Sequence, residues 1–262
     1  DLFCSRLITT DTKILHFFSI ASSLTVEKAK EMNVRTVFDW GIAYAPILRE
    51  LLNIEYERHG LKFVDDFDIQ QNENMLSASD KIMVPSAYVF ESFKGTNYLN
   101  KIEILPYGFP RGSIKNNYCA LSRKKPINIC FAGTFCVRKG AIYLLKALKK
   151  LKDSKVKFHF TIFGTVENQL RDHILFKDND KIVVRPIPNS RMLTAMQKQD
   201  IFLFPTLCEG MARVVAEAMS VGLPVITTKE SGYSDFIQNN INGILIKSRS
   251  EEAILDSVTN LI

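Results

Sequence analysis

The sequence predicts an α/β protein built from two doubly wound units, each with its own parallel sheet. Short runs of β-branched and aromatic residues alternate along the whole chain with longer segments of helical period, which is typical of repeated βα units. A stretch rich in glycine, proline and basic residues interrupts this alternation at residues 106–126. The chain has 262 residues, of which 46% are hydrophobic, so it can bury two cores.

The first half predicts four strands separated by helices. The strand-like runs cover residues 14–18, 36–39, 81–84 and 101–105. The helical stretches cover residues 25–31, 45–57, 69–78 and 87–93. Ser86 precedes the last helix, and its hydroxyl can accept a hydrogen bond from a first-turn amide. We therefore expect a thin α/β domain over residues 1–110.

The second half predicts a larger, Rossmann-like sheet over residues 127–262. Polar and basic residues fill the preceding segment, 111–126, which we interpret as the linker between domains. Beyond it, helical segments alternate with six strand-like runs, at residues 127–131, 158–163, 182–184, 201–204, 224–227 and 243–246. A last helical pattern begins near Glu251 and runs to Ile262 without a cap, and the chain starts at Asp1 without an initiator methionine. We therefore expect a fragment of a longer protein.

Composition excludes several classes of protein. The longest apolar runs fall far short of the roughly 20 residues that span a bilayer. The cysteines are odd in number and form no C-x-x-C pair, which argues against a disulfide framework or a zinc site and predicts a reducing, cytoplasmic location. They are Cys4, Cys119, Cys130, Cys136 and Cys208.

The positive charge is concentrated in the second half. Residues 1–120 carry 13 basic and 15 acidic side chains, net −2, whereas residues 121–262 carry 21 and 13, net +8. Such an excess suits nucleic acid, anionic lipid or a phosphorylated small molecule. Because net charge alone does not distinguish among these ligands, the choice depends on the sequence motifs.

The most informative segment surrounds two glutamates that are eight residues apart. A strand-like run ends at Phe204, a loop carries Glu209, and a helix is expected to open at about Met211 and to carry Glu217. The amides of residues 211–213 would then be first-turn donors, which suit a phosphate. Carboxylates repel a phosphate but are strong acceptors for sugar hydroxyls. The segment therefore suggests a nucleotide sugar as ligand.

A second basic element follows the strand at residues 127–131. Gly133 allows close backbone approach to a ligand, and Arg138 and Lys139 offer positive charge to phosphates. The sequence contains neither G-x-G-x-x-G nor G-x-x-x-x-G-K-[ST], which argues against a nicotinamide dinucleotide site and a P-loop.

These residues resemble those of the retaining glycosyltransferases of the GT-B fold, most closely glycosyltransferase family 4. Three motifs carry the resemblance: Gly133 with Arg138, Lys139 and Gly140; the E-x7-E pair Glu209 and Glu217; and EAMSVGLPVI at 217–226 followed by Gly232. The fold it implies is two Rossmann-like domains facing across a cleft, the first one truncated. The resemblance implies retaining, metal-independent transfer of a hexose from a nucleoside diphosphate sugar to a glycan, lipid or small-molecule acceptor, with no cofactor.

The resemblance also implies a role for each matched residue. Arg138 and Lys139 hold the diphosphate, and Glu209 contacts the transferred sugar. Glu217 binds the ribose. The remaining donor-binding positions are Gly133, Gly210, Met211, Ala212, Val214 and Ile187.

The first half resembles the acceptor domain of the same family, through VRTVFDWG at 34–41, KIMVPSAYVFESF at 81–93 and ILPYG at 104–108. The opening strands and the closing helix of the family are missing. Asp39 stands where many members have an active-site histidine, and His16 is a second candidate on the acceptor side. Thr134 replaces a common arginine, and Met211-Ala212 replace a common Phe-Gly.

Three alternatives stay open. One is a catalytically silent protein of the same fold that binds a nucleotide or glycan. Another is a nucleic-acid binder, which we do not favour because the basic run has no interleaved aromatic residues on which bases could stack. The basic run consists of Lys146, Lys149, Lys150, Lys152, Lys155 and Lys157, and we interpret it as a solvated helix face. The third alternative is that this run makes peripheral contact with an anionic inner membrane surface.

Overall fold

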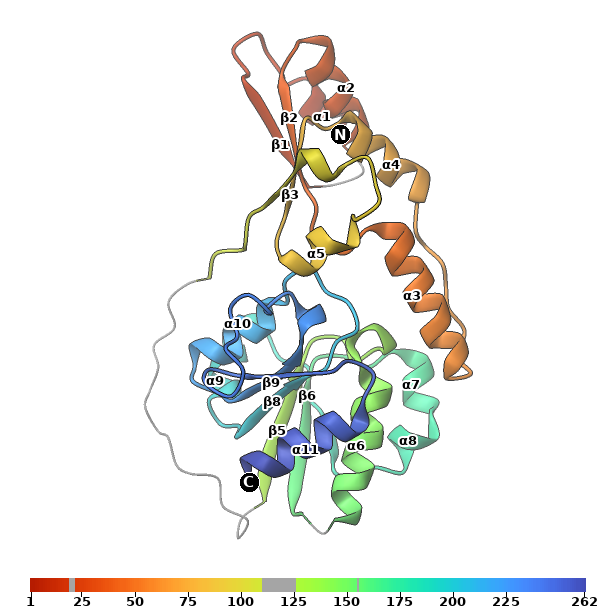
Figure 1. The fold of residues 1–262 in the computed structure, drawn as a ribbon, viewed down its shortest axis with the longest axis vertical. Helices are drawn as coiled ribbons and strands as arrows, with labels where there is room; N and C mark the ends of the chain where they lie inside the picture. Colours follow the sequence, from red (N-terminus) through yellow and green to blue (C-terminus); the bar gives the residue numbers. More distant parts are fainter. Residues whose placement is uncertain (19–21, 110–125, 155) are drawn as a thin grey trace.

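The computed structural model describes residues 1–18, 22–109, 126–154 and 156–262. Within them the chain forms two parallel sheets that share no strand (Figure 1). The first has the order β1-β2-β3-β4, and the second has the order β10-β9-β8-β5-β6-β7. The predicted α/β class with parallel sheets is confirmed.

The first sheet carries the N-terminal helices. Its strands are β1 (Ile14–Phe17), β2 (Arg35–Asp39), β3 (Lys81–Val84) and β4 (Ile102–Ile104). Every neighbouring pair is parallel. The helices are α1 (Leu2–Ser5), α2 (Ser23–Glu31), α3 (Ala45–Arg58), α4 (Ile69–Ala78) and α5 (Ala87–Ser92), with the short 3₁₀ turn η1 (Leu99–Lys101).

The second sheet is larger. Its strands are β5 (Ile127–Ala132), β6 (Phe158–Phe163), β7 (Ile182–Val184), β8 (Ile201–Phe204), β9 (Val225–Thr228) and β10 (Ile244–Ile246). The helices are α6 (Ala141–Asp153), α7 (Asn168–Asp172), α8 (Ile174–Lys177), α9 (Asn189–Met196), α10 (Arg213–Ser220) and α11 (Glu251–Leu261). Two 3₁₀ turns, η2 (Val137–Lys139) and η3 (Lys229–Ser231), follow β5 and β9.

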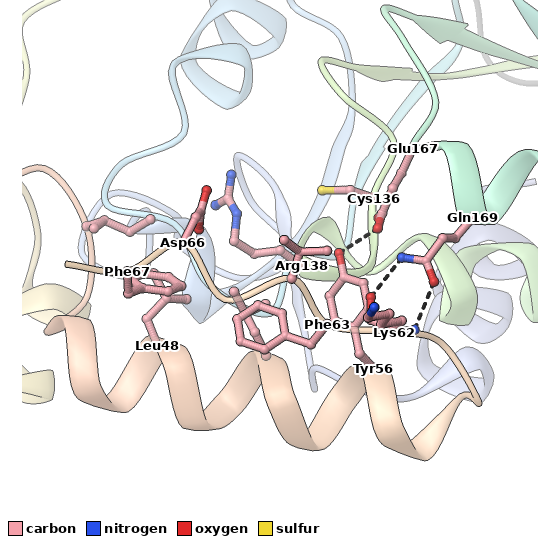
Figure 2. Close-up of a pocket in the computed structure, with 13 residues that line it drawn as sticks. Leu48, Tyr56, Lys62, Phe63, Asp66, Phe67, Cys136, Arg138, Glu167 and Gln169 are labelled. Atoms are coloured by element: carbon pink, nitrogen blue, oxygen red, sulfur yellow. Dashed lines mark hydrogen bonds between the residues drawn. The ribbon is translucent and has the colours of Figure 1, made fainter. Parts of the chain in front are cut away.

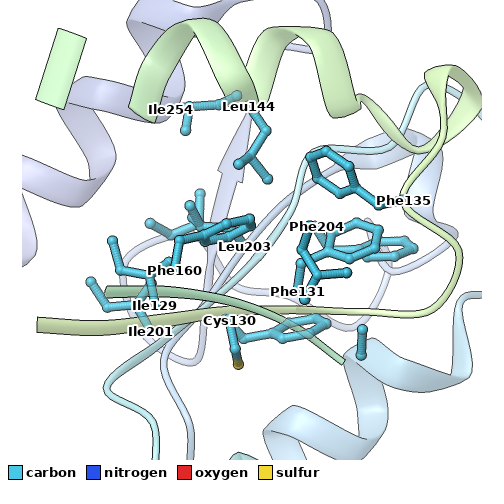
Figure 3. Close-up of a cluster of buried hydrophobic side chains, with 14 of the residues drawn as sticks. Ile129, Cys130, Phe131, Phe135, Leu144, Phe160, Ile201, Leu203, Phe204 and Ile254 are labelled. Atoms are coloured by element: carbon cyan, nitrogen blue, oxygen red, sulfur yellow. The ribbon is translucent and has the colours of Figure 1, made fainter. Parts of the chain in front are cut away.

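A phenylalanine-rich core fixes the centre of the second sheet. All four residues of β8 are buried, as expected of a central parallel strand covered on both faces. The Phe131 and Phe204 rings stack with centroids 5.4 Å apart, and Phe135 meets Phe131 edge to face at 5.1 Å. Figure 3 shows Leu144 of α6 and Ile254 of α11 closing this cluster on one side. This packing fixes the positions of the carboxyl ends of β5 and β8 relative to each other.

Two helices of the first half connect the sheets. Figure 1 shows α3 running from the first sheet down beside α7, and α5 lying between the first sheet and α10. The Tyr56 hydroxyl of α3 donates to Glu167 Oε1 at 2.7 Å. Gln169 exchanges two hydrogen bonds of 2.8 Å with the backbone of Lys62. These contacts set one half of the chain against the other.

All ten predicted strands are present, and their ends differ from the prediction by no more than one residue. The single-turn helices α1, α7 and α8 were not predicted, because four or five residues are too few to show a helical period. Two helix starts are wrong: α2 begins at Ser23 and not at Thr25, and α10 begins at Arg213 and not at Met211. The expected linker lies outside the described residues except for Pro126, so the domain boundaries stay a prediction.

Candidate active site

The carboxyl ends of β5, β8 and β9 meet at one edge of the second sheet, where open α/β sheets bind ligands. β5 pairs directly with β8, and β8 pairs with β9. The loop and turn after β5 carry Arg138 and Lys139, and the loop after β8 carries Glu209. The strand order therefore brings together the two sequence motifs that were predicted to bind a nucleotide sugar.

Lys139 lies in a narrow cradle beside Gly133. Gly133 has a φ of +107°, and a Cβ atom at this position would lie 2.9 Å from Lys139 Nζ. The ammonium group also lies 5.7 Å from the centre of the buried Phe204 ring. Only 17% of the lysine side chain is exposed. Glycine is thus favoured here by its backbone conformation, and the end of the Lys139 side chain lies close beside it.

Arg138 is paired with Glu209 across the two loops. Its Nη1 atom lies 2.8 Å from Glu209 Oε1 and donates to the carbonyl of Cys208 at 2.7 Å. Lys139 Nζ lies 3.7 Å from the same carboxylate oxygen. Burial disfavours the charge on Arg138, but the Glu209 carboxylate outweighs burial and the pKa of Arg138 is raised. The site therefore contains a compact cluster of two cations and one anion.

Glu209 Oε1 is buried, and no donor among the described residues is aligned with it for a hydrogen bond. Arg138 Nη1 lies 2.8 Å from this oxygen and compensates its charge, while a lone pair of the oxygen stays free for a further donor. A buried carboxylate oxygen that lacks a donor favours a ligand hydroxyl, which would supply one. A sugar hydroxyl meets this requirement.

The loop from Glu209 to Ala212 is anchored on both sides. The Glu209 amide donates to the carbonyl of Glu230 at 2.8 Å, and the Ala212 amide donates to the carbonyl of Ser231 at 2.9 Å. At Gly210, a Cβ atom would lie 1.7 Å from the carbonyl oxygen of Gly41 in the first half. Only glycine allows this approach, so the loop after β8 touches the backbone of the loop after β2 in the first half.

The expected phosphate donors at the start of α10 need a correction. Ala212 is the N-cap residue, and its amide is already bonded to Ser231. The amides of Met211, Arg213 and Val214 have no acceptor among the residues that the structure describes. Of the three predicted donors, the amides of Met211 and Arg213 are thus free and that of Ala212 is not, and the first turn adds the free amide of Val214.

Glu217 lies on α10 and is half-buried. No side chain described by the structure bonds to its carboxylate, and the nearby Tyr233 hydroxyl is buried close to the Ala216 amide. Burial, reinforced by the Glu217 charge, raises the pKa of Tyr233. Ile187 is half-buried in the loop after β7, three strands away from β8.

The acceptor-side candidates meet at the end of the first sheet. His16 Nε2 lies 3.8 Å from Asp39 Oδ2, on the neighbouring strands β1 and β2. Asp39 lines an open pocket of about 320 Å³ together with Trp40 and Asn72. The Trp40 indole nitrogen is buried without a partner among the described residues. His16 and Asp39 are therefore neighbours, as residues of one site would be.

A second open cavity, of about 370 Å³, adjoins Arg138 (Figure 2). Leu48, Leu52 and Phe63 form its apolar wall on the first half of the chain. Cys136, Arg138 and Glu167 line it on the second half. The cavity thus connects the paired Arg138 with α3, a connection that the sequence did not predict.

The cysteines at the site are structural. Burial raises the pKa of Cys208 to about 11 and also raises that of Cys136. Cys208 packs against Ala43, Leu48 and Leu52. Both groups are therefore neutral thiols at neutral pH, and Cys208 packs as a small buried hydrophobe while Cys136 is half-buried.

The basic run on α6 is largely a solvated helix face. Lys150 pairs with Glu251 and Glu252, and Lys152 pairs with Asp180. Lys155 lies outside the described residues. The described helices include none that is long and apolar enough to cross a membrane. In the same part of the chain, no group of three or more His, Cys, Asp or Glu side chains is placed to hold a metal ion.

The curated relatives include bacterial glycosyltransferases of polysaccharide biosynthesis. The chain is 30% identical over 140 residues to the amylovoran biosynthesis glycosyltransferase AmsK of Erwinia amylovora, covering 50% of this chain and 34% of that protein. It is 27% identical over 192 residues to the putative teichuronic acid biosynthesis glycosyltransferase TuaC of Bacillus subtilis, covering 73% and 44%. The chain thus spans between a third and a half of the length of these relatives.

Solved structures share the fold at low sequence identity. HepE of Anabaena, solved in complex with UDP, superposes with a TM-score of 0.71 at 12% identity, over 96% of this chain and 69% of that one. TarM of S. aureus, solved with UDP, gives 0.76 at 14% identity, over 99% and 50%. These neighbours are GT-B glycosyltransferases. The family model described as "Glycosyl transferases group 1" matches residues 120–262, more than half of the chain. The chain therefore belongs to the glycosyl transferases group 1 family.

Proposed function

We propose that this protein is a retaining glycosyltransferase that moves a hexose from a nucleoside diphosphate sugar to a glycan, lipid or small-molecule acceptor. The observation that carries the proposal is the junction of Arg138, Lys139 and Glu209 beside unpaired backbone amides at the ends of β5 and β8. Cations and amides suit a diphosphate, and the buried carboxylate oxygen suits a sugar hydroxyl. The relatives that act in polysaccharide biosynthesis support an acceptor of that class.

In this proposal the protein stabilises the leaving diphosphate. Negative charge accumulates on the β-phosphate as the sugar bond breaks, and Lys139, Arg138 and the amides of Arg213 and Val214 are donors placed in advance. These residues supply this stabilisation without a metal ion. Attack on the same face of the sugar as the leaving group would give retention of configuration, with the leaving phosphate as the proton acceptor.

A transfer assay tests the function. The protein is incubated with UDP-, GDP- and ADP-hexoses and lipid or glycan acceptors, with and without a chelator, and the anomeric configuration of the product is read by NMR. Transfer with retention, unaffected by the chelator, supports the proposal. Binding of the nucleotide without transfer or donor hydrolysis would favour the silent binding protein.

Cellular location is a separate proposal. We place the protein in the cytoplasm, where nucleotide sugars are donors, with contact to an anionic membrane as a secondary possibility. The ion pairs of Lys150 and Lys152 neutralise part of the basic run and leave Lys149 and Lys157 exposed. Each basic residue near such a surface contributes about 1 kcal/mol, so these two by themselves give only weak attraction.

A nucleoside diphosphate is expected to stabilise the protein against heat. At 100 times the dissociation constant, binding to the native state contributes about 2.7 kcal/mol, which corresponds to a rise in Tm of roughly 5–10 °C. Thermal shift measurements should rank the best of UDP, GDP and ADP well above its nucleoside, because the site binds through phosphate. Equal shifts for nucleoside and diphosphate would contradict the phosphate site.

Alanine substitutions at Glu217 and Glu209 are expected to affect the binding of a nucleoside diphosphate and of its sugar conjugate differently. Glu217→Ala should weaken nucleoside diphosphate and nucleotide sugar alike by about 10- to 100-fold, since a hydrogen bond to a charged group is worth about 1.5–3 kcal/mol. Glu209→Ala should leave diphosphate affinity unchanged or raise it a few-fold, because Arg138 loses its carboxylate partner, while the affinity for the nucleotide sugar falls. Calorimetry with both ligands measures the difference.

Glu209→Gln is the matched variant, since it keeps the size of the side chain and removes its charge. If Glu209→Ala and Glu217→Ala weaken bare diphosphate to the same extent, the assignment of Glu209 to the sugar and Glu217 to the ribose is wrong.

A further inference from the structure

The first half of the chain contacts the loop that carries Glu209 directly. Ser86, at the N-cap of α5, donates from Oγ to the carbonyl of Gly210 at 2.6 Å. Ser86 is 1% exposed, so water does not compete for this bond. Tyr88 donates to the carbonyl of Leu207 at 3.3 Å, and the Gly41 carbonyl packs on the Cα of Gly210. Three acceptor-side residues thus hold the donor-side loop.

We propose that Ser86 is a positioning residue that orients the Gly210–Met211 peptide for binding of the donor. The proposal rests on the proposed function and adds a residue from the opposite half of the chain to the donor site. In this proposal Ser86 itself touches neither the diphosphate nor the sugar of the donor. It acts through the peptide that it holds.

The planarity of the peptide bond explains how Ser86 orients the amide of Met211. In a trans peptide the C=O and the N–H point in opposite directions, so a hydrogen bond that fixes the carbonyl of Gly210 also fixes the amide of Met211. That amide has no acceptor among the described residues. Held in place, it is a preorganised donor next to Glu209, where a phosphate or sugar oxygen is expected.

The surrounding anchors leave this peptide dependent on Ser86. The amides of Glu209 and Ala212 are bonded to the carbonyls of Glu230 and Ser231, so both flanks of the loop are held from within the second half. Between them, the Gly210 carbonyl has a single described donor, Ser86 Oγ. Gly232 packs closely against this carbonyl and the Cα of Met211 but gives the carbonyl no hydrogen-bond donor, so without Ser86 the peptide keeps only packing contacts.

The bond also links the donor site to the packing of the two halves. Ser86 and Gly210 lie 124 positions apart in the sequence, on opposite sides of the contact between the sheets. A donor that binds the Met211 amide therefore favours the arrangement in which Ser86 reaches Gly210. By thermodynamic linkage, that arrangement favours the donor to the same extent.

Three variants test the proposal. Ser86→Ala removes the hydroxyl, Ser86→Thr retains it, and Ser92→Ala is the matched control. Ser92 lies at the other end of α5, and its hydroxyl bonds only to Val89 and Tyr44, both in the first half. Ser86 also caps α5 weakly, accepting from the Val89 amide at 3.4 Å, so the control accounts for a general loss of stability in this helix.

The first readout is turnover. The probe is whichever of UDP, GDP and ADP gives the largest thermal shift, together with its glucose conjugate, and hydrolysis of the conjugate gives kcat and KM. We expect Ser86→Ala to lower kcat about tenfold with less than a threefold change in KM. Ser86→Thr should recover most of the loss. Ser92→Ala should lower Tm without changing kcat.

The second readout is hydrogen exchange, which needs no activity. Ser86→Ala should speed deuterium uptake in peptides that cover residues 207–215 of the free protein and should weaken their protection by the nucleoside diphosphate. Ser92→Ala should do neither. If Ser86→Ala and Ser92→Ala have the same effect on turnover and exchange, Ser86 is only structural and the proposal is overturned. If the unmodified protein neither binds the nucleotide nor hydrolyses the conjugate, the proposed function fails, whereas exchange in the free protein still decides whether Ser86 anchors the loop.

Discussion

Replacing Lys139 with alanine is expected to lower turnover of the nucleotide sugar by about 10²- to 10³-fold, equivalent to about 2.7–4 kcal/mol of transition-state stabilisation. The ammonium group is mostly buried, lies 3.7 Å from Glu209 Oε1 and sits over Phe204. A cation in such a place stabilises charge that develops on the leaving phosphate more than it stabilises the bound donor. Steady-state kinetics on donor hydrolysis or transfer measure kcat and KM separately.

Lys139→Arg should recover only part of the activity. A planar guanidinium fork cannot occupy the position of the compact ammonium beside Gly133. Lys149→Ala, an exposed change on α6, is the matched control and should leave turnover unchanged. If the Lys139→Ala enzyme has an unchanged kcat and only a raised KM, Lys139 stabilises the bound donor and the transition state equally, and the leaving-group role is wrong.

Loss of Glu55 is expected to cause the largest change in stability. This carboxylate, on α3, is fully buried and pairs with Arg58 and with Arg249 from the second half of the chain. It also accepts from the Tyr143 hydroxyl at 2.9 Å. Breaking a buried pair typically costs 3–5 kcal/mol, and because both arginines are partly exposed we expect the lower end, about 3 kcal/mol, for Glu55→Ala.

Urea denaturation measures this loss. Glu50→Ala, an exposed change on the same helix, is the control and should stay within about 0.5 kcal/mol of the unmodified protein. Since Glu55 joins the two halves, its loss should also separate their unfolding into two transitions. A single transition with an unchanged midpoint would show that the cluster contributes no net stability.

The strands and the longer helices could be predicted because their signals are local. β6, β7 and β8 begin and end where the run of apolar residues does, and α4 spans its predicted range. The start of α10 was missed by two residues, because Met211 and Ala212 are compatible with a helix, whereas the backbone of Ala212 is extended, with ψ at 102°, and its amide bonds to Ser231. The first residue of α10 was therefore determined by a tertiary contact, because residue preference alone left it open.

The candidate site could be predicted in part. Arg138, Lys139 and Glu209 were identified by residue type and by their place after predicted strands, and the strand order brings them together. Their pairing was not foreseen, since Arg138 and Glu209 were assigned to separate parts of the donor. Ser86 was correctly predicted as an N-cap, but its stronger bond to Gly210 has no signal in the local sequence.

The sequence by itself determined the α/β class, the ten strands and the residue types that gather at the ends of β5 and β8. Each of these depends on hydrophobic period, turn residues or parallel strand order, which act over a few neighbouring residues or one βα unit. Tertiary structure alone decided that Ser86 meets Gly210 and that Glu55 meets Arg249, pairs that are 124 and 194 positions apart. Such contacts depend on how the two sheets pack. Packing follows from the combined shape of many side chains and leaves no periodic pattern in the chain.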